Sequence, residues 1–123
     1  MSVLVDTSVW IRFLSNRAPH ATGLEQLLSR DEVSGHDLVY GELLIGDRGG
    51  RQALLSDYGL MDRAPLVPHA EVVAFVHDRK LNGRGIGWVD AHLLASALIA
   101  QLKLWTADAA LAAIAAELGI AHE

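Results

Sequence analysis

The stretch VLVDTSVWI, residues 3–11, places an acid directly after a short apolar run. Val3, Leu4 and Val5 form a mostly β-branched run that is typical of a buried strand. Thr7 or Ser8 can cap a helix that we expect to continue to about Ser15. The stretch therefore predicts a strand, an acid at its carboxyl end, and then a helix.

Beyond this stretch, strand-like and helix-like apolar segments alternate along the chain. We expect strands over residues 2–5, 32–35, 64–67 and 103–106, with a short last one at 120–121. We expect helices over residues 21–29, 37–45 with Asp37 as N-cap, 51–58, 69–81, 89–101 and 109–118. The helix over 89–101 is apolar nearly all round and is expected to be buried. This alternation predicts an α/β fold with a parallel sheet.

Length and composition narrow the class of protein. A chain of 123 residues fits one domain, 1–123. The absence of cysteine excludes disulfides, thiolate metal sites and a cysteine nucleophile. No apolar run is long enough for a membrane span, and the N-terminus does not resemble a signal peptide, so we expect a cytoplasmic protein with no membrane contact. The net charge of -5 argues against a plain electrostatic nucleic-acid binder, unless acids are gathered around cations that reverse the local field.

Two acids follow predicted strands. Asp6 ends the first strand, and Asp108 comes shortly after LWT at 104–106. Ligands in open α/β sheets bind outside the carboxyl ends of the strands, so both acids are expected at one edge. The alternative is that each Asp only caps the helix that follows it.

Two further acids interrupt predicted helices. The helical neighbours of Glu42 at three and four positions are Leu38, Val39, Ile45 and Gly46, so Glu42 is expected to interrupt an apolar stripe. Asp90 has only Leu93, Leu94 and Ala97 on its face and no basic residue within a turn. A buried carboxylate is costly unless it is paired or binds a metal. The alternatives are a Glu42 that reaches water at the edge of the stripe and an Asp90 that acts as an N-cap.

Together, the four acids indicate a metal site. Hard divalent cations such as Mg²⁺ and Mn²⁺ prefer carboxylate oxygens and keep several waters. Without metal, four carboxylates would repel one another and would repel phosphate. With metal, such a site can activate water and stabilise an in-line displacement at phosphorus.

Four segments of the sequence, in order, resemble the motifs of the PIN-domain ribonucleases, and most closely the VapC-type toxins of toxin–antitoxin pairs. They are VLVDTSVWI at 3–11, VYGELLIG at 39–46, GIGWVDAHLLASALI at 85–99 and LWTADAAL at 104–111. The resemblance covers essentially the whole chain. It assigns the family's acidic positions, catalytic and metal-binding, to Asp6, Glu42, Asp90 and Asp108, of which Asp108 occupies the most variable position.

The resemblance also implies the surroundings and the partners of the site. Thr7, Ser8 and Thr106 are implied as supporting groups that orient Asp6 or a metal-bound water. The implied fold is a three-layer α/β/α sandwich with a short, mainly parallel sheet. The implied activity is Mg²⁺- or Mn²⁺-dependent endonuclease cleavage of RNA, leaving 5′-phosphate and 3′-hydroxyl ends. The implied partners are RNA, a VapB-type antitoxin that blocks the site, and a second copy of the chain in a homodimer.

Other residues receive more ordinary interpretations. His92 lies about 200° around a helix from Asp90 and is expected outside the metal site. The remaining histidines are interpreted as surface or capping residues. The best candidate for a phosphate contact is the Asn82-Gly83-Arg84-Gly85 loop, within a scattered set of basic residues, Arg12, Arg48, Arg51, Arg79, Lys80 and Arg84. Trp10, Leu14, Leu43 and Leu44 are either core residues or an antitoxin groove.

Four other functions can be compared with the sequence. A phosphotransferase of the haloacid dehalogenase kind needs a second Asp two residues after the first, where this chain has Ser8. A response-regulator receiver needs an acidic pair near the first strand and a late Lys after a strand, whereas Lys103 precedes its strand. A DNA-directed PIN-fold nuclease stays open, because the metal chemistry does not use the ribose 2′-hydroxyl. A non-catalytic module that binds nucleic acid or a partner also stays open.

Overall fold

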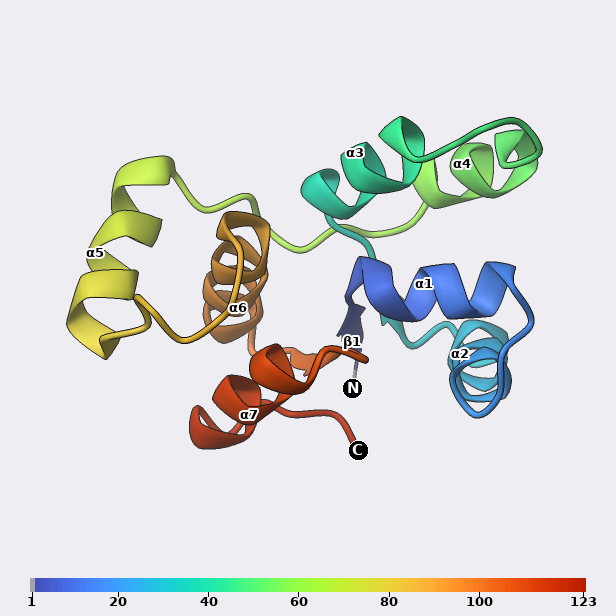
Figure 1. Ribbon diagram of the computed structural model, residues 1–123. Helices are drawn as coiled ribbons and strands as arrows, with labels where there is room; N and C mark the ends of the chain where they lie inside the picture. The colour runs from blue at the N-terminus through green and yellow to red at the C-terminus, as the bar shows by residue number, and fades with distance from the viewer. Residues whose placement is uncertain (1) are drawn as a thin grey trace.

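A computed structural model describes residues 2–123 of the chain (Figure 1). The strands are β1 (Val3–Val5), β2 (Val33–Ser34) and β3 (Lys103–Trp105). The helices are α1 (Thr7–Leu14), α2 (His20–Ser29), α3 (Asp37–Ile45), α4 (Gln52–Gly59), α5 (His69–Arg79), α6 (Trp88–Ala100) and α7 (Ala109–Glu117). The predicted α/β class is confirmed.

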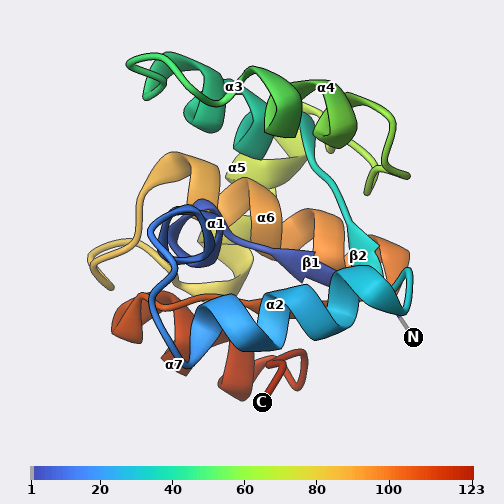
Figure 2. The same ribbon diagram turned by 90° about the vertical axis from the view of Figure 1, so that its right-hand side faces the viewer.

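The sheet is parallel, with β1 between β2 and β3. Val3 pairs with Val33 on one side and with Lys103 on the other, and Val5 pairs with Trp105. Helices lie on both sides of the sheet, with α1 and α2 on one side and α5 and α6 on the other (Figure 1). Figure 2 shows β1 lengthwise between α2 and α6, with α3 and α4 above it in this view and α7 below it. This is the sandwich that the resemblance implies.

The core follows from the apolar patterns. All three residues of β1 are buried, because helices cover both faces of a parallel sheet. Helix α6 buries every residue from Ala91 to Ala97, which confirms the prediction of a buried helix. The bulky side chains of Trp10 and Tyr58 pack edge to face with their ring centroids 5.3 Å apart. Burial of each large apolar side chain contributes roughly 1.5–3 kcal/mol to folding.

The predicted strand over 64–67 is wrong. Only Arg63 pairs there, in an isolated parallel bridge with Gly35. Pro65 has no N–H to donate and Pro68 ends the segment, so a longer ladder cannot form. The Pro65 carbonyl instead accepts a hydrogen bond of 2.7 Å from Ser96 Oγ. The short strand predicted at 120–121 is likewise reduced to a bridge between Leu104 and Ala121.

Two predicted helix caps are also wrong. Asp6 is the N-cap of α1, so Thr7 and Ser8 lie inside the helix, and the Asp6 side chain makes no cap bond. His36, not Asp37, caps α3, and its Nδ1 accepts a hydrogen bond of 3.0 Å from the Leu38 N–H. Sequence patterns favour Asp over His at this position, whereas burial of His36 fixes the outcome here. No helix within residues 2–123 is long and apolar enough to cross a membrane.

Candidate active site

The four predicted acids come from four separate elements. Asp6 follows β1, Glu42 lies in α3, Asp90 lies in the first turn of α6, and Asp108 is the N-cap of α7 after β3. Asp6 is buried, with 5% of its surface exposed, and Asp90 is partly buried. Glu42 and Asp108 are exposed to solvent. The site therefore combines buried and solvent-exposed carboxylates.

The electrostatics of Asp90 show that the four carboxylates share one neighbourhood. Burial raises the pKa of Asp90 above the usual carboxyl value, and the charges of Asp6, Asp108 and Glu42 raise it further. A hydrogen bond from the Gly87 N–H opposes this shift in the Asp90 pKa. Among the described residues the ion pairs are Arg63–Asp37 and Arg84–Glu117, so no Lys or Arg forms one with the four acids. In this part of the chain, no ion pair balances their negative charge.

Asp6 is held by two hydroxyl groups from opposite ends of the chain. Its Oδ2 accepts hydrogen bonds of 2.7 Å from Ser8 Oγ and 2.8 Å from Thr106 Oγ1. Each hydroxyl in turn accepts a bond of 3.0 Å from a backbone N–H, Ser8 from Ala107 and Thr106 from Asp108. The predicted supporting groups Ser8 and Thr106 thus fix Asp6 to the loop that carries Asp108.

Glu42 is positioned by Thr7, the third predicted supporting residue. Thr7 Oγ1 is buried in the first turn of α1 and donates a hydrogen bond of 2.6 Å to Glu42 Oε1. The expectation that Glu42 interrupts a buried stripe is wrong, because Glu42 is exposed and Leu43 faces the core. The local pattern failed because the exposed face of α3 also carries large apolar residues, Leu44 and Ile45.

Asp90 and Asp108 each bond to the backbone of their own helix start. Asp90 Oδ2 accepts a hydrogen bond of 2.9 Å from the Gly87 N–H at the start of α6. This is the half of a capping box that the third helical residue supplies, since glycine has no side chain for the other half. Asp108 Oδ1 accepts a hydrogen bond of 2.9 Å from the Leu111 N–H. Asp108 therefore caps α7 with one of its two oxygens, whereas Asp90 lies three residues inside its cap. Gly87 was missed from sequence, because the capping-box pattern has Ser or Thr at the N-cap and this chain has glycine there.

The four carboxylates suit a hard cation by chemistry. In each, one oxygen is held by a hydrogen bond, and within residues 2–123 no hydrogen bond reaches the second oxygen of Asp6, Glu42, Asp90 or Asp108. As these side chains lie, no three acidic or histidine residues of the described chain are close enough to hold a metal ion. Mg²⁺ needs only one or two direct carboxylates, since it keeps most of its waters. The donors fit such an ion without forming a closed cage.

The other predicted residues lie around this site or away from it. The His92 ring packs edge to face against Trp88, with the ring centroids 5.2 Å apart. Arg12 donates a hydrogen bond of 3.1 Å to the Ser8 carbonyl, and Arg84 is tied to Glu117. Of the four apolar residues left open, Trp10 and Leu43 are core residues, whereas Leu14 and Leu44 are exposed.

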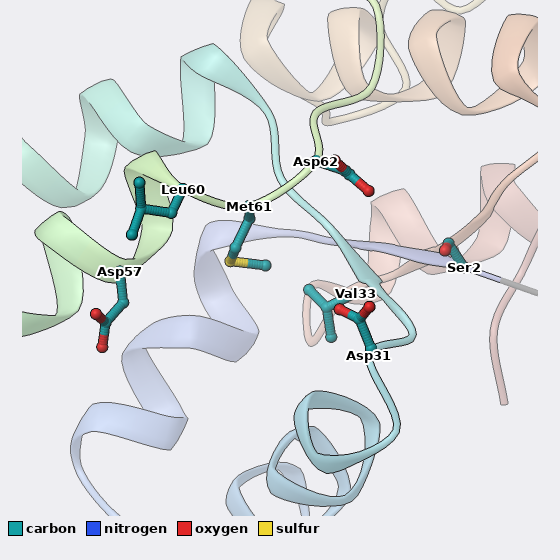
Figure 3. A pocket seen from close by; sticks show the side chains of 7 residues that line it. All are labelled: Ser2, Asp31, Val33, Asp57, Leu60, Met61 and Asp62. Carbon is teal, nitrogen blue, oxygen red and sulfur yellow. The ribbon is translucent and has the colours of Figure 1, made fainter.

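A further cavity lies at the opposite end of the sheet from the acids. It has a volume of about 360 Å³ and is lined by residues next to the amino ends of β1 and β2, such as Ser2 and Asp31, and by the end of α4 (Figure 3). Three acids line it, Asp31, Asp57 and Asp62, but Figure 3 shows the Asp57 carboxylate well apart from the other two. This cavity belongs to a different region from the four carboxylates.

Comparison with known proteins agrees with this geometry. A family model described as PIN domain matches residues 3–117. The chain belongs to the PIN-domain family. The matched PIN-domain range includes all four acids, from Asp6 to Asp108.

Two relatives and one solved structure extend the comparison. The proteins named Ribonuclease VapC32 from Mycobacterium tuberculosis, strains CDC 1551 / Oshkosh and ATCC 25618 / H37Rv, are each 46% identical over 120 residues, which is 97% of this chain and 94% of theirs. The crystal structure of PAE2754 from Pyrobaculum aerophilum matches with a TM-score of 0.55 and 20% identity, over 92% of this chain and 78% of that one. The relatives confirm the VapC-type resemblance, and the solved structure supports the PIN fold.

Proposed function

We propose that this PIN-domain protein is the toxin of a toxin–antitoxin pair and cleaves RNA internally with Mg²⁺ or Mn²⁺. The observation that carries the proposal is the convergence of Asp6, Glu42, Asp90 and Asp108, none of which forms an ion pair with a Lys or Arg within residues 2–123. The two relatives at 46% identity are named ribonucleases, which favours RNA over DNA as the substrate. We also propose that residues 1–123 form one PIN domain, that a VapB-type antitoxin binds this protein, and that it forms a homodimer.

The proposed reaction is hydrolysis of one phosphodiester bond. A bound divalent cation would lower the pKa of water and stabilise the charge that develops at phosphorus. The water oxygen forms a bond to phosphorus, the bond to the 3′-oxygen breaks, and that oxygen takes up a proton. The products carry a 5′-phosphate and a 3′-hydroxyl. The ribose 2′-hydroxyl takes no covalent part.

Neighbouring groups of this chain hold the carboxylates in place by hydrogen bonds. Ser8 and Thr106 fix Oδ2 of Asp6, Thr7 fixes Oε1 of Glu42, and the Gly87 N–H fixes Oδ2 of Asp90. The second oxygen of each acid stays available to a cation. Positioning of this kind lowers the reorganisation that the reaction would otherwise require.

The test is cleavage of total cellular RNA by the purified protein free of antitoxin. Reactions contain Mg²⁺, Mn²⁺ or EDTA, and single-stranded DNA is assayed in parallel. The proposal predicts discrete RNA fragments with 5′-phosphate ends, formed only with metal and absent for Asp90→Asn. Cleavage that continues in EDTA or in Asp90→Asn would contradict the proposed site, and preferential cleavage of DNA would contradict the proposed substrate.

A further inference from the structure

Arg12 is a basic side chain that is tied directly to the groups that hold Asp6. Its Nη1 donates a hydrogen bond of 3.1 Å to the Ser8 carbonyl. The hydroxyl of the same Ser8 donates the bond of 2.7 Å to Asp6 Oδ2 and lies 3.3 Å from Thr106 Oγ1. One residue, Ser8, therefore contacts both the Arg12 guanidinium and the Asp6 carboxylate.

The geometry of α1 directs the Arg12 side chain toward the acids. Ser8 and Arg12 are four positions apart in α1 and therefore lie on one face of this helix. Side chains of a helix lean toward its N-terminus, which for α1 is Asp6. On the same face, Ser8 Oγ accepts a bond of 3.0 Å from the Ala107 N–H, in the loop that carries Asp108. The guanidinium thus points along α1 to the end of the sheet where the acids lie.

The segment after α1 also lies against a strand end that supports Asp6. The ring of His20, at the start of α2, stacks on Trp105 with the ring centroids 5.8 Å apart and an interplanar angle of 29°. Trp105 directly precedes Thr106, whose hydroxyl bonds Asp6. Figure 1 and Figure 2 both show α1 between α2 and α3, the helix that carries Glu42. Helix α1 therefore has groups of the site on two sides.

Most of the hydrogen-bonding capacity of Arg12 is unused. A guanidinium has five N–H donors in a rigid plane. Within residues 2–123 the bond to the Ser8 carbonyl is the one hydrogen bond of this side chain, and no carboxylate forms an ion pair with it. Arg12 is partly buried, so the guanidinium is held in place while its other donors remain available to an anion.

The neighbouring sequence adds positive charge and no acid. Residues 7–24, from the start of α1 into α2, contain Arg12 and Arg17 and no Asp or Glu. The Arg17 N–H donates a bond of 2.8 Å to the Arg12 carbonyl, and Arg17 is exposed and absent from the ion pairs of the described residues. In contrast, Arg84, the residue of the loop that the sequence favoured for a phosphate contact, pairs with Glu117. The structure therefore favours Arg12 over Arg84 as an anion-binding residue.

We propose that Arg12 binds a phosphate of the RNA strand next to the phosphate that is cleaved. The inference rests on the proposed function, because it takes RNA as the substrate. A divalent ion offsets the charge of the phosphate that it binds, whereas the flanking phosphates meet the remaining negative charge of the four acids. A guanidinium can bind a phosphate through two parallel N–H donors. A phosphate contact carries no sequence information, so Arg12 contributes affinity and places the strand without selecting a base.

The test measures RNA binding as a function of salt, separately from cleavage. In the Asp90→Asn background, which the proposed site predicts to be inactive, end-labelled RNAs of about ten A, C or U nucleotides are titrated between about 50 and 200 mM salt. Arg12→Met removes the charge from a long side chain, and Arg12→Lys keeps it. The control Arg30→Met makes the same charge change at an exposed residue beside Asp31, at the other end of the sheet. Thermal unfolding checks the folding of each variant.

We expect Arg12→Met to weaken binding of all three RNAs by a similar factor, roughly 10-fold at the lowest salt, as for loss of one charge-assisted contact. The slope of log affinity against log salt should become shallower by about 0.7, the value for one phosphate contact on a single strand. Arg12→Lys should keep the slope and part of the affinity, because an ammonium group does not bind phosphate in the bidentate way. Arg30→Met should match the parent.

A calorimetric titration of Mn²⁺ separates this role from support of Asp6. Arg12→Met in the otherwise unmodified protein should bind Mn²⁺ as the unmodified protein does. A loss of Mn²⁺ affinity with an unchanged salt slope of RNA binding would overturn the inference, since Arg12 would then act on Asp6 through Ser8.

Equal RNA affinities and salt slopes of Arg12→Met and Arg30→Met would also overturn the inference. Cleavage by the unmodified protein is measured in parallel. If the unmodified protein neither cleaves nor binds RNA, the proposed function fails and the role of Arg12 fails with it. Intact cleavage together with unchanged binding by Arg12→Met refutes only the role of Arg12.

Discussion

Thr106 lies 100 positions after Asp6, yet its hydroxyl donates a hydrogen bond of 2.8 Å to Asp6 Oδ2. The contact follows from the sheet, because Val5 pairs with Trp105 and the next residue of each strand emerges at the same edge. The Asp6 N–H also donates a bond of 2.8 Å to the Trp105 carbonyl. The pairing that builds the core therefore also orients the buried carboxylate of the site.

Removal of the Thr106 hydroxyl should impair metal binding more than folding. Thr106→Val keeps the shape of the side chain but leaves Asp6 Oδ2 with Ser8 alone. Loss of a group that orients a metal ligand typically costs 10- to 100-fold in metal affinity or activity, and we expect roughly that loss in the rate of RNA cleavage. Thr106→Ser should restore most of the rate. Ser29→Ala, which removes an exposed hydroxyl bonded to the Gln26 carbonyl, is the control and should leave the rate unchanged. A Thr106→Val rate equal to that of the unmodified protein would refute this role.

Thr7→Val should separate activity from stability. The valine fills the buried space of Thr7, while Glu42 is exposed and can bond water in place of Thr7 Oγ1. We expect the free energy of unfolding to fall by no more than about 1.5 kcal/mol, the net value of one hydrogen bond. Cleavage should fall by roughly 10-fold or more, because Glu42 becomes free to rotate. Denaturant unfolding and initial rates measure the two effects. A large loss of stability with normal cleavage would show that Thr7 supports the fold and does not position Glu42 for cleavage.

The buried His36 makes stability depend on pH. Its Nδ1 accepts from the Leu38 N–H, and its Nε2 lies 2.9 Å from Ser96 Oγ, whose own proton goes to the Pro65 carbonyl. These bonds fit only the neutral ring with its proton on Nε2. Burial lowers the pKa of His36 below the usual value near 6.5.

The sign of this effect follows from linkage. Since the unfolded chain binds the proton more readily, the His36 contribution is complete above about pH 6.5 and is lost as the pH falls below that value. His36→Asn should lower stability at pH 7.5 by about 1 kcal/mol or more, through the lost bond to Ser96. It should also weaken the decline between pH 7 and pH 5, measured by denaturant unfolding. An unchanged decline in His36→Asn would assign the effect to other groups.

Asp90→Asn should make the metal-free protein more stable while it abolishes cleavage. Burial and the charges of three other acids raise the Asp90 pKa, so its ionised form is disfavoured in the fold. Asn removes that charge, and its carbonyl oxygen can still accept from the Gly87 N–H. In EDTA at pH 7 we expect a higher Tm, with roughly 4 °C for each kcal/mol regained. The gain should shrink as the pH falls and Asp90 itself becomes protonated. A lower Tm for Asp90→Asn at pH 7 would show that the carboxylates do not repel one another.

Much of the site could be predicted from sequence because strand ends and local motifs are readable along the chain. Asp6 and Asp108 were placed at one sheet edge by the strands that precede them, and all four acids came from motifs in a fixed order. The predicted helix over 89–101 was recognised as buried from its composition, and it carries Asp90 in its first turn.

The failures at Glu42 and His36 share one physical cause, which is that burial is set by tertiary contacts. Glu42 was expected in a buried stripe, but the exposed face of α3 also carries the large apolar residues Leu44 and Ile45, so periodicity could not tell the two faces apart. His36 was expected at the surface or as a cap, and it is a fully buried cap because Tyr58 and Ser96 surround it. The Thr7–Glu42 bond joins two helices 35 positions apart, which no local pattern encodes.

The most direct test of the four-carboxylate site is calorimetric titration of Mn²⁺ into the unmodified protein, Asp90→Asn and Asp57→Asn. Asp57 lines the acidic cavity at the other end of the sheet, so Asp57→Asn makes the same change in net charge away from the site. We predict that the unmodified protein and Asp57→Asn bind Mn²⁺ with equal affinity and that Asp90→Asn loses at least about 10-fold. Equal binding by Asp90→Asn and the unmodified protein, or a loss confined to Asp57→Asn, would contradict the assignment of the metal site to Asp6, Glu42, Asp90 and Asp108.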